Sequence, residues 1–242
     1  MQTIARLLVV SLLLALPLRA ERSLENARRA QARLDPASWS EIIRIENVAA
    51  HSRYPRVLHA LVFEFAGVLW FYTETDGTQS FSLHQNALAE EKADFAPLLR
   101  DIEPGFVRWT VVPLEGASLR RDEALLRNGC FIDSIAAWQE RRMLGLPGRA
   151  PRLLSYYADI GPKRWGHTVL AYEIDGKLEV VDPTRRKEHR TFPASFGRDA
   201  LSLARTLAGE RVIKARYVSV PETTGPMNVA ARSTPSRTGD TM

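Results

Sequence analysis

The only cysteine of the chain, Cys130, lies in the stretch Arg-Asn-Gly-Cys-Phe-Ile-Asp over residues 127–133. A lone cysteine cannot form a disulfide within its own chain, so its thiol is either buried and inert or chemically active. Asn128 can cap a helix over 129–142, which places Cys130 at the second helical position. Free backbone N–H groups and the helix dipole favour an anion there, and a thiolate is the form that attacks carbonyl carbons. The position suits a nucleophile, although free cysteines are also common in protein cores.

A nucleophile of this kind needs a base, and His167 is the histidine with a partner within reach. The strand-like segment that His167 opens is followed by Asp175-Gly176, a pair typical of two-residue hairpin turns, and by a second strand ending at Asp182. Such a turn makes His167 and Asp182 diagonal neighbours on one face, roughly 7–8 Å apart between backbones. Asp182 can then orient the imidazole, as a nucleophile–base pair requires. The remaining histidines are interpreted as surface or core residues: His51, His59, His84 and His189.

These residues, in the order Cys, His and Asp, resemble the catalytic residues of the transglutaminase-like superfamily. The resemblance is carried by NGCFIDSIAAW over 128–138 and by GHTVLAYEIDGKLEVVDPT over 166–184, and it covers residues 115–220. It implies an α+β, papain-like fold in which the nucleophile helix packs on an antiparallel sheet. It also implies that Cys130 is the nucleophile, His167 the base and Asp182 the orienting acid.

The resemblance further implies a cysteine peptidase or amidase that forms a thioester acyl-enzyme. Water would then give hydrolysis and an amine would give transamidation, on a protein, a peptide or a peptidoglycan peptide. The backbone N–H of Cys130 is the first candidate for holding the oxyanion. The family also uses an upstream aromatic or amide side chain for this purpose. The candidates in this chain are Gln79, Trp109 and Trp165, and both tryptophans are also plausible core residues.

Two other functions are weighed against this one. Arg-Asn-Gly-Cys also resembles the cysteine motif of arylamine N-acetyltransferases, but Val-Asp-Pro-Thr over 181–184 fits that family less well, and an exported enzyme would lack acetyl-CoA. The second alternative is an inactive transglutaminase-like domain that binds a partner in the cell envelope. The run 185–187, Arg-Arg-Lys, offers a contact for an acidic partner, or simply a solvated face.

Hydrophobic periodicity and turn residues predict the other elements. Helices are predicted over 21–50 with a break at Pro36, over 86–102 with Asn86 as cap and Pro97 disturbing it, and over 119–127, 129–142 and 195–208. Strands are predicted over 59–83 with a turn at Asp76-Gly77, and over 106–114, 167–174, 177–182 and 211–220. Helices and strands do not alternate strictly, so the sequence predicts an α+β fold.

The segments group into five regions. They are a signal peptide over 1–20, a polar helical segment over 21–56, a β-rich part over 57–114, the catalytic core over 115–220 and a disordered tail over 221–242. The tail prediction rests on its Pro, Ser, Thr and Gly content.

The signal peptide is predicted from the order of charged, apolar and small residues. Arg6 precedes the apolar run 7–16, Pro17 ends that run, and Ala20 is a small residue at a cleavage point. We expect export to a periplasm or beyond, with no stable membrane insertion after cleavage; the alternative is an N-terminal anchor. N-terminal sequencing should find native protein beginning near Glu21, and intact Met1 in the cytosol would contradict export.

Composition and the lack of certain motifs argue against nucleic-acid, metal and cofactor binding. The net charge is +5, and the 33 Lys and Arg residues are scattered rather than striped, so nucleic acid is not an expected partner. The sequence contains no metal-ligand motif, phosphate-binding glycine loop or dinucleotide fingerprint, and therefore no cofactor or metal is expected.

Overall fold

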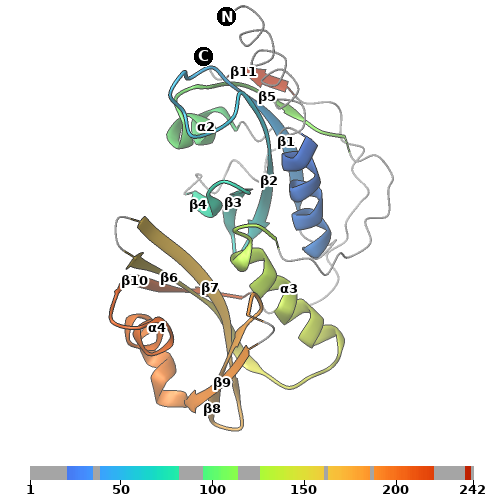
Figure 1. Ribbon diagram of the computed structural model, residues 1–242. Helices are drawn as coiled ribbons and strands as arrows, with labels where there is room; N and C mark the ends of the chain where they lie inside the picture. Colours follow the sequence, from blue (N-terminus) through green and yellow to red (C-terminus); the bar gives the residue numbers. More distant parts are fainter. Residues whose placement is uncertain are drawn as a thin grey trace, which may run out of the picture. The chain divides into compact units, whose positions relative to one another are not determined.

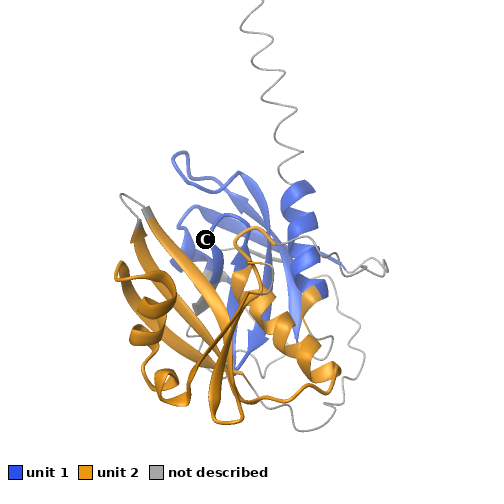
Figure 2. Cartoon of the chain, turned by 60° about the horizontal axis from the view of Figure 1, so that its bottom comes forward, with its two compact units in different colours: residues 1–32, 38–122, 228–242 blue, residues 33–37, 123–227 orange. Residues whose placement is uncertain are grey.

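The fold combines helices with two antiparallel sheets, which confirms the α+β class (Figure 1). The computed structural model describes residues 21–34, 39–81, 95–113, 126–160, 163–185, 188–220 and 238–240. The chain divides into two compact units (Figure 2). Unit 1 comprises residues 1–32, 38–122 and 228–242, and unit 2 comprises residues 33–37 and 123–227. The predicted signal peptide lies outside the described residues.

Unit 1 is built on a sheet with the strand order β11-β5-β1-β2-β3-β4. Its elements are β1 (Ser40–Asn47), β2 (Val57–Phe65), β3 (Val68–Thr73), β4 (Gly77–Phe81), α2 (Ala96–Ile102), β5 (Phe106–Val111) and β11 (Thr238–Asp240). Apolar side chains of β1, β2, β3 and β5 form its core together with Phe95 and Leu99. Residues 21–33 are helical.

The predicted helix over 21–50 is wrong in its second half, because residues 40–47 form β1. Ile43 and Ile45 are fully buried in the unit 1 core, and β1 pairs with β2 on one side and β5 on the other. Pairing on both edges satisfies the backbone of this segment, and its β-branched residues suit a strand. The polar residues between them misled the sequence interpretation.

The predicted strand region over 59–83 contains a turn that the sequence analysis missed. The chain reverses at Ala66-Gly67, where φ is 56° and 69°, so that Phe65 pairs with Val68. Positive φ at both central residues is the geometry of a type I′ hairpin turn. A turn does link β3 and β4 as predicted, but it consists of residues 74–76, and Gly77 is already the first residue of β4, paired with Thr73.

Three other predictions for this unit need correction or fall outside the described part. Pro97 lies in the first turn of α2, where proline is tolerated, and so does not disturb the helix. Residues 86–94, with Asn86, and 119–125 lie outside the described residues. The tail prediction is wrong at β11, which pairs with β5, while 221–237 and 241–242 are not described.

Unit 2 is built on a second sheet with the strand order β10-β6-β7-β8-β9. Its elements are α3 (Cys130–Met143), β6 (Arg149–Ile160), β7 (Lys163–Ile174), β8 (Lys177–Asp182), β9 (Glu188–Pro193), the 3-10 helix η2 (Ala194–Arg198), α4 (Ala200–Ala208) and β10 (Val212–Ser219). The predicted helix over 195–208 is divided at Asp199, whose carboxylate caps α4 by accepting from Leu201 and Ser202 N–H.

Both faces of this sheet are covered by helices (Figure 1). α4 packs on β10 and β6, and its Leu203 and Ala204 share a core cluster with Val169 and Ala171 of β7. α3 packs on β7 and β6, with Trp138 against Tyr172. Tyr172 faces away from Ala171 because side chains alternate along a strand. Strands buried on both faces lose the polar–apolar alternation that identifies strands in sequence. The sequence analysis missed β6 and the edge strand β9, and it started β7 too late.

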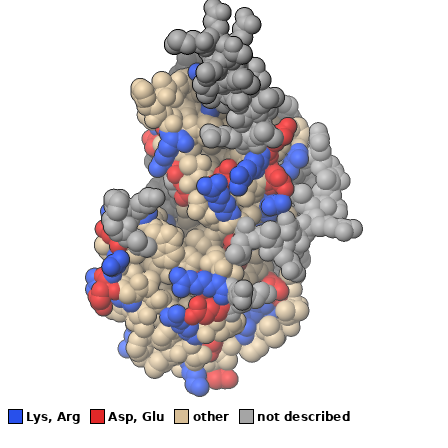
Figure 3. All heavy atoms as spheres, viewed as in Figure 1, with Lys and Arg blue, Asp and Glu red and all other residues tan. Residues whose placement is uncertain are grey.

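Within the described residues no helix is long and apolar enough to cross a membrane. On the face seen in Figure 3, Lys and Arg side chains are interspersed with Asp and Glu side chains.

Candidate active site

The hairpin of β7 and β8 has the predicted register. Asp175 and Gly176 have φ of 49° and 74°, so they form the two-residue turn that pairs Ile174 with Lys177. His167 and Asp182 consequently meet, with 2.8 Å between Nε2 of the imidazole and Oδ2 of the carboxylate. The geometric part of the sequence prediction is confirmed.

Asp182 is held by more donors than His167 alone. Its Oδ1 accepts hydrogen bonds from the backbone N–H of Thr184 at 3.0 Å and from the Thr184 hydroxyl at 2.7 Å. Arg185 Nε lies 3.6 Å from Oδ2. Burial alone would raise the pKa of Asp182, but the hydrogen bonds from His167 and Thr184 outweigh it and lower the pKa to about 2. The carboxylate is therefore charged and fixed in direction.

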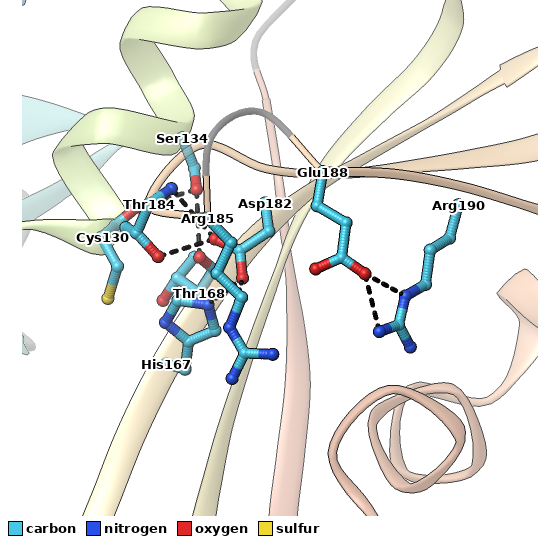
Figure 4. Close-up of polar contacts among 9 residues, drawn as sticks. All are labelled: Cys130, Ser134, His167, Thr168, Asp182, Thr184, Arg185, Glu188 and Arg190. Atoms are coloured by element: carbon cyan, nitrogen blue, oxygen red, sulfur yellow. Dashed lines mark hydrogen bonds and ion pairs between the residues drawn. The ribbon is translucent and has the colours of Figure 1, made fainter.

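His167 is largely buried and contacts two aromatic rings, which also contact each other. Trp165 stacks on the imidazole at 4.9 Å between ring centroids, and Tyr156 meets it edge-on at 5.7 Å. Burial alone would lower the pKa of His167, but the hydrogen bond to Asp182 and the hydrogen bond and charge of Cys130 raise it to about 9. Because Asp182 occupies Nε2, Nδ1 is the nitrogen left for the Cys130 thiol (Figure 4).

Cys130 is the first residue of α3, and its local backbone explains the residues before it. The cap residue is Gly129, so the prediction of Asn128 as the cap is wrong by one position. Asn128 instead has φ of 54°, a left-handed conformation that asparagine tolerates better than most residues. A Cβ on Gly129 would clash with the side chain of Leu126. The half-buried thiol thus follows a turn that Asn-Gly is suited to make.

The first turn of α3 is fixed to the edge of β7 beside His167. Ser134, which is fully buried, has its hydroxyl 2.8 Å from the carbonyl of Cys130 and 3.2 Å from that of Thr168. β8 ends at Asp182, and its pairing with β7 covers residues 170–174, so β8 does not pair with β7 at Thr168. Ser134 fixes the start of α3 to this part of β7, next to His167. The body of α3 packs on the face of β7 that carries Tyr172.

A second anchor of α3 is a buried ion pair. Asp133, in the first turn of α3, pairs with Arg33 across 100 positions of sequence. The side chains of Arg33 and Asp133 are only 12% and 3% exposed. Asp133 Oδ2 is buried without a hydrogen-bond partner in the part of the chain that the structure describes. Arg33 is therefore the charge that compensates this carboxylate.

Arg33→Met should lower the free energy of unfolding by about 3 kcal/mol, because it leaves the Asp133 carboxylate buried without its cation. In a chain of this size that is a fall in Tm of roughly 6–12 °C. Arg29→Met is the matched control, since Arg29 pairs with Glu25 on the surface of the same helix and should cost less than about 1 kcal/mol. Thermal unfolding followed by circular dichroism measures both, and equal Tm values for the two variants would contradict the role of Arg33.

The oxyanion candidates fall in different places. Trp165 belongs to the site through its stacking on His167. Trp109 is in unit 1, where it is 4% exposed and packs edge-on against Phe95 in the core. Gln79 is in β4 of unit 1, and its side chain lies outside the described part. The Cys130 backbone N–H is in the first helical turn, where an α-helix provides no acceptor for it.

The other histidines that the structure describes are surface or core residues, as predicted. His59 is buried beside Ser23, whose hydroxyl lies 3.1 Å from Nδ1. His51 and His189 are exposed, and His84 lies outside the described residues.

Sequence reasoning missed three side chains of the site. Thr184 could have been found, because an aspartate commonly accepts from the N–H two residues on. Ser134 follows Cys130 by one helical turn, a spacing that places both on one side of the helix. Tyr156 gave no signal, since it lies opposite His167 in the unpredicted strand β6.

Comparison of the chain with protein-family models, curated proteins and solved structures found no match. Among the described residues, no three His, Cys, Asp or Glu side chains gather in a way that could hold a metal ion. The site combines a thiol at a helix start, an imidazole that interacts with it, and a carboxylate that fixes the imidazole. This combination can carry out nucleophilic acyl chemistry.

Proposed function

We propose that this protein is a transglutaminase-like cysteine hydrolase that acts on peptide or side-chain amide bonds. The observations that carry the proposal are the hydrogen bond that joins His167 to Asp182 and the position of Cys130 as the first residue of α3. Asp182 holds Nε2 of His167 at 2.8 Å, which leaves Nδ1 as the nitrogen for the sulfur. The pKa of His167, raised to about 9, favours the imidazolium that accompanies a thiolate.

The reaction begins when the Cys130 thiolate attacks the amide carbonyl carbon and forms a C–S bond. The carbonyl oxygen becomes an oxyanion, for which the Cys130 backbone N–H is a donor. The C–N bond then breaks, and His167 Nδ1 gives its proton to the leaving amine. Water attacks the resulting thioester while His167 takes its proton, and release of the carboxylic acid regenerates the thiolate–imidazolium pair. An amine in place of water gives transamidation by the same steps.

The arrangement of elements supports the transglutaminase-like, papain-like fold as part of this proposal. The nucleophile begins helix α3, which packs on an antiparallel sheet, and the base and acid come from adjacent strands of that sheet. The substrates we propose are proteins, peptides or peptidoglycan peptides met after export. No residue described here requires a cofactor for these steps.

Iodoacetamide should alkylate Cys130 at pH 6 at least about tenfold faster than it alkylates a free cysteine derivative, because an ordinary thiol is almost fully protonated at that pH. The chain has one cysteine, so mass spectrometry of the intact protein reports this site alone. His167→Gln should lose the acceleration, whereas His189→Gln, an exposed change in the same sheet, should keep it. An unreactive Cys130 would instead favour a structural cysteine in an inactive binding domain.

A further inference from the structure

A hollow opens beside Asp182, and all of its lining residues belong to unit 2. The hollow is open rather than enclosed, and its volume of about 300 Å³ includes open solvent. Its polar lining includes Tyr156, Asp182 and Arg185. Its apolar lining consists of Val169, Val180 and Leu207. The hollow therefore combines hydrogen-bonding groups of the catalytic region with an aliphatic surface.

Among the charged side chains that line this hollow, Arg185 is the cation with the weaker ion pair. Glu188 also lines it, but Arg190 holds that carboxylate through two contacts of 2.7 and 2.8 Å. Asp182 is already engaged by His167 and Thr184. Arg185 touches Asp182 only through Nε at 3.6 Å, and its side chain is 58% exposed.

The terminal nitrogens of Arg185 are available to a ligand. Figure 4 shows them turned away from Asp182, and no contact joins them to another described side chain. Arg190, in contrast, is committed to Glu188 (Figure 4). Arg185 can therefore present a pair of N–H donors at the rim of the hollow.

Tyr156 supplies a second, neutral donor. The residue is only 4% exposed, and it lines the hollow. Burial and the negative charges of Asp182 and Cys130 raise the pKa of Tyr156 well above its ordinary value, against the opposing effect of Arg185. The phenol therefore keeps its proton and can donate it in a hydrogen bond to a ligand in the hollow.

We propose that this hollow binds a carboxylate of the substrate, so that amides with a free carboxylate near the scissile bond are preferred. Arg185 and Tyr156 are the specificity-determining donors, and the inference rests on the proposed function of Cys130. Two donors match the two oxygens of a carboxylate, and Val169, Val180 and Leu207 suit its aliphatic stem. A cationic substrate group is disfavoured because both nearby carboxylates are already engaged.

The test uses reagents that differ only in this carboxylate. Iodoacetyl-glycine, iodoacetyl-β-alanine and iodoacetyl-γ-aminobutyrate carry it at increasing distances from the reactive carbon, and their primary carboxamides are the neutral partners. The ratio of alkylation rates within each pair cancels the reactivity of the thiol itself. For at least one spacer, wild-type protein should prefer the carboxylate by roughly threefold to tenfold, the range for one partly exposed charged hydrogen bond.

Arg185→Gln should bring that ratio to the value measured with a free cysteine derivative, and Tyr156→Phe should lower it roughly twofold to threefold. Arg211→Gln is the control, because it removes the same charge next to β10, at the opposite edge of the sheet from β9. Ratios that Arg185→Gln leaves unchanged for every spacer would overturn the carboxylate site while Cys130 reactivity still supports the proposed function. A Cys130 that no reagent labels faster than a free thiol would overturn both.

Discussion

Cys130→Ala is expected to abolish amide cleavage and transamidation while the chain still folds. In the proposed mechanism the sulfur of Cys130 is the atom that bonds to the substrate, and alanine has no group that could replace it. The expected loss of turnover is at least about 1,000-fold, as for other enzymes that lose a covalent nucleophile. The measurement is release of amine from a peptide amide that the wild-type protein cleaves.

The fold should tolerate this change because alanine suits the first turn of a helix and the site is only half-buried. The bond from Ser134 to the carbonyl of residue 130 is independent of the side chain. Cys130→Ser is the closer control for shape, since it keeps a hydroxyl where the thiol was and should also be nearly inactive. Wild-type turnover by the alanine variant would exclude the mechanism, and failure of both variants to fold would identify a structural cysteine.

The part of the site that the sequence predicts is the part fixed by local chemistry. Asp175-Gly176 determines a two-residue turn, the turn determines the register, and the register brings His167 to Asp182. The single cysteine at a helix start is likewise a local feature, and the error of one position in the cap arose from the left-handed backbone of Asn128.

The features that the sequence did not predict depend on distant pairing. β1 forms because β2 and β5 border it, and β6 lies between β10 and β7. Tyr156 reaches His167 only through the pairing of β6 with β7. The Arg33–Asp133 pair joins residues 100 positions apart. None of these contacts has a signal in a window of a few residues, so a single sequence could not identify the hollow or the second anchor of α3.

Asp182→Asn is expected to lower turnover by roughly 100-fold to 10,000-fold, because it reverses the hydrogen-bonding pattern around His167. Asp182 accepts at both oxygens: Oδ1 from two Thr184 groups and Oδ2 from His167. An asparagine has one oxygen, which the two Thr184 donors would claim. Its NH₂ group would then face Nε2 and place the imidazole proton on Nδ1, the nitrogen that must accept it from the thiol.

Asp175→Asn is the matched control for this prediction. It removes the same charge from the same hairpin, and asparagine is well suited to the left-handed position that Asp175 occupies in the turn. Its turnover should equal that of the wild-type protein. Equal turnover of Asp182→Asn and Asp175→Asn would show that the carboxylate does not orient the base.

The pH dependence separates an orienting role for Asp182 from a merely structural one. The pKa of His167 is raised from 6.5 to about 9, so the imidazolium is kept below that pH, and the alkaline limb of kcat/KM should fall near pH 9. The stability that His167 contributes is complete below pH 6.5 and is lost as the pH rises through about 9. In Asp182→Asn burial still lowers the pKa of His167 while the largest opposing interaction is gone, so the alkaline limb should move to lower pH. The difference in Tm between the wild-type protein and Asp182→Asn should shrink as the pH rises from 6.5 to about 9. If the alkaline limb of kcat/KM stays near pH 9 in the variant, Asp182 does not set the protonation of His167.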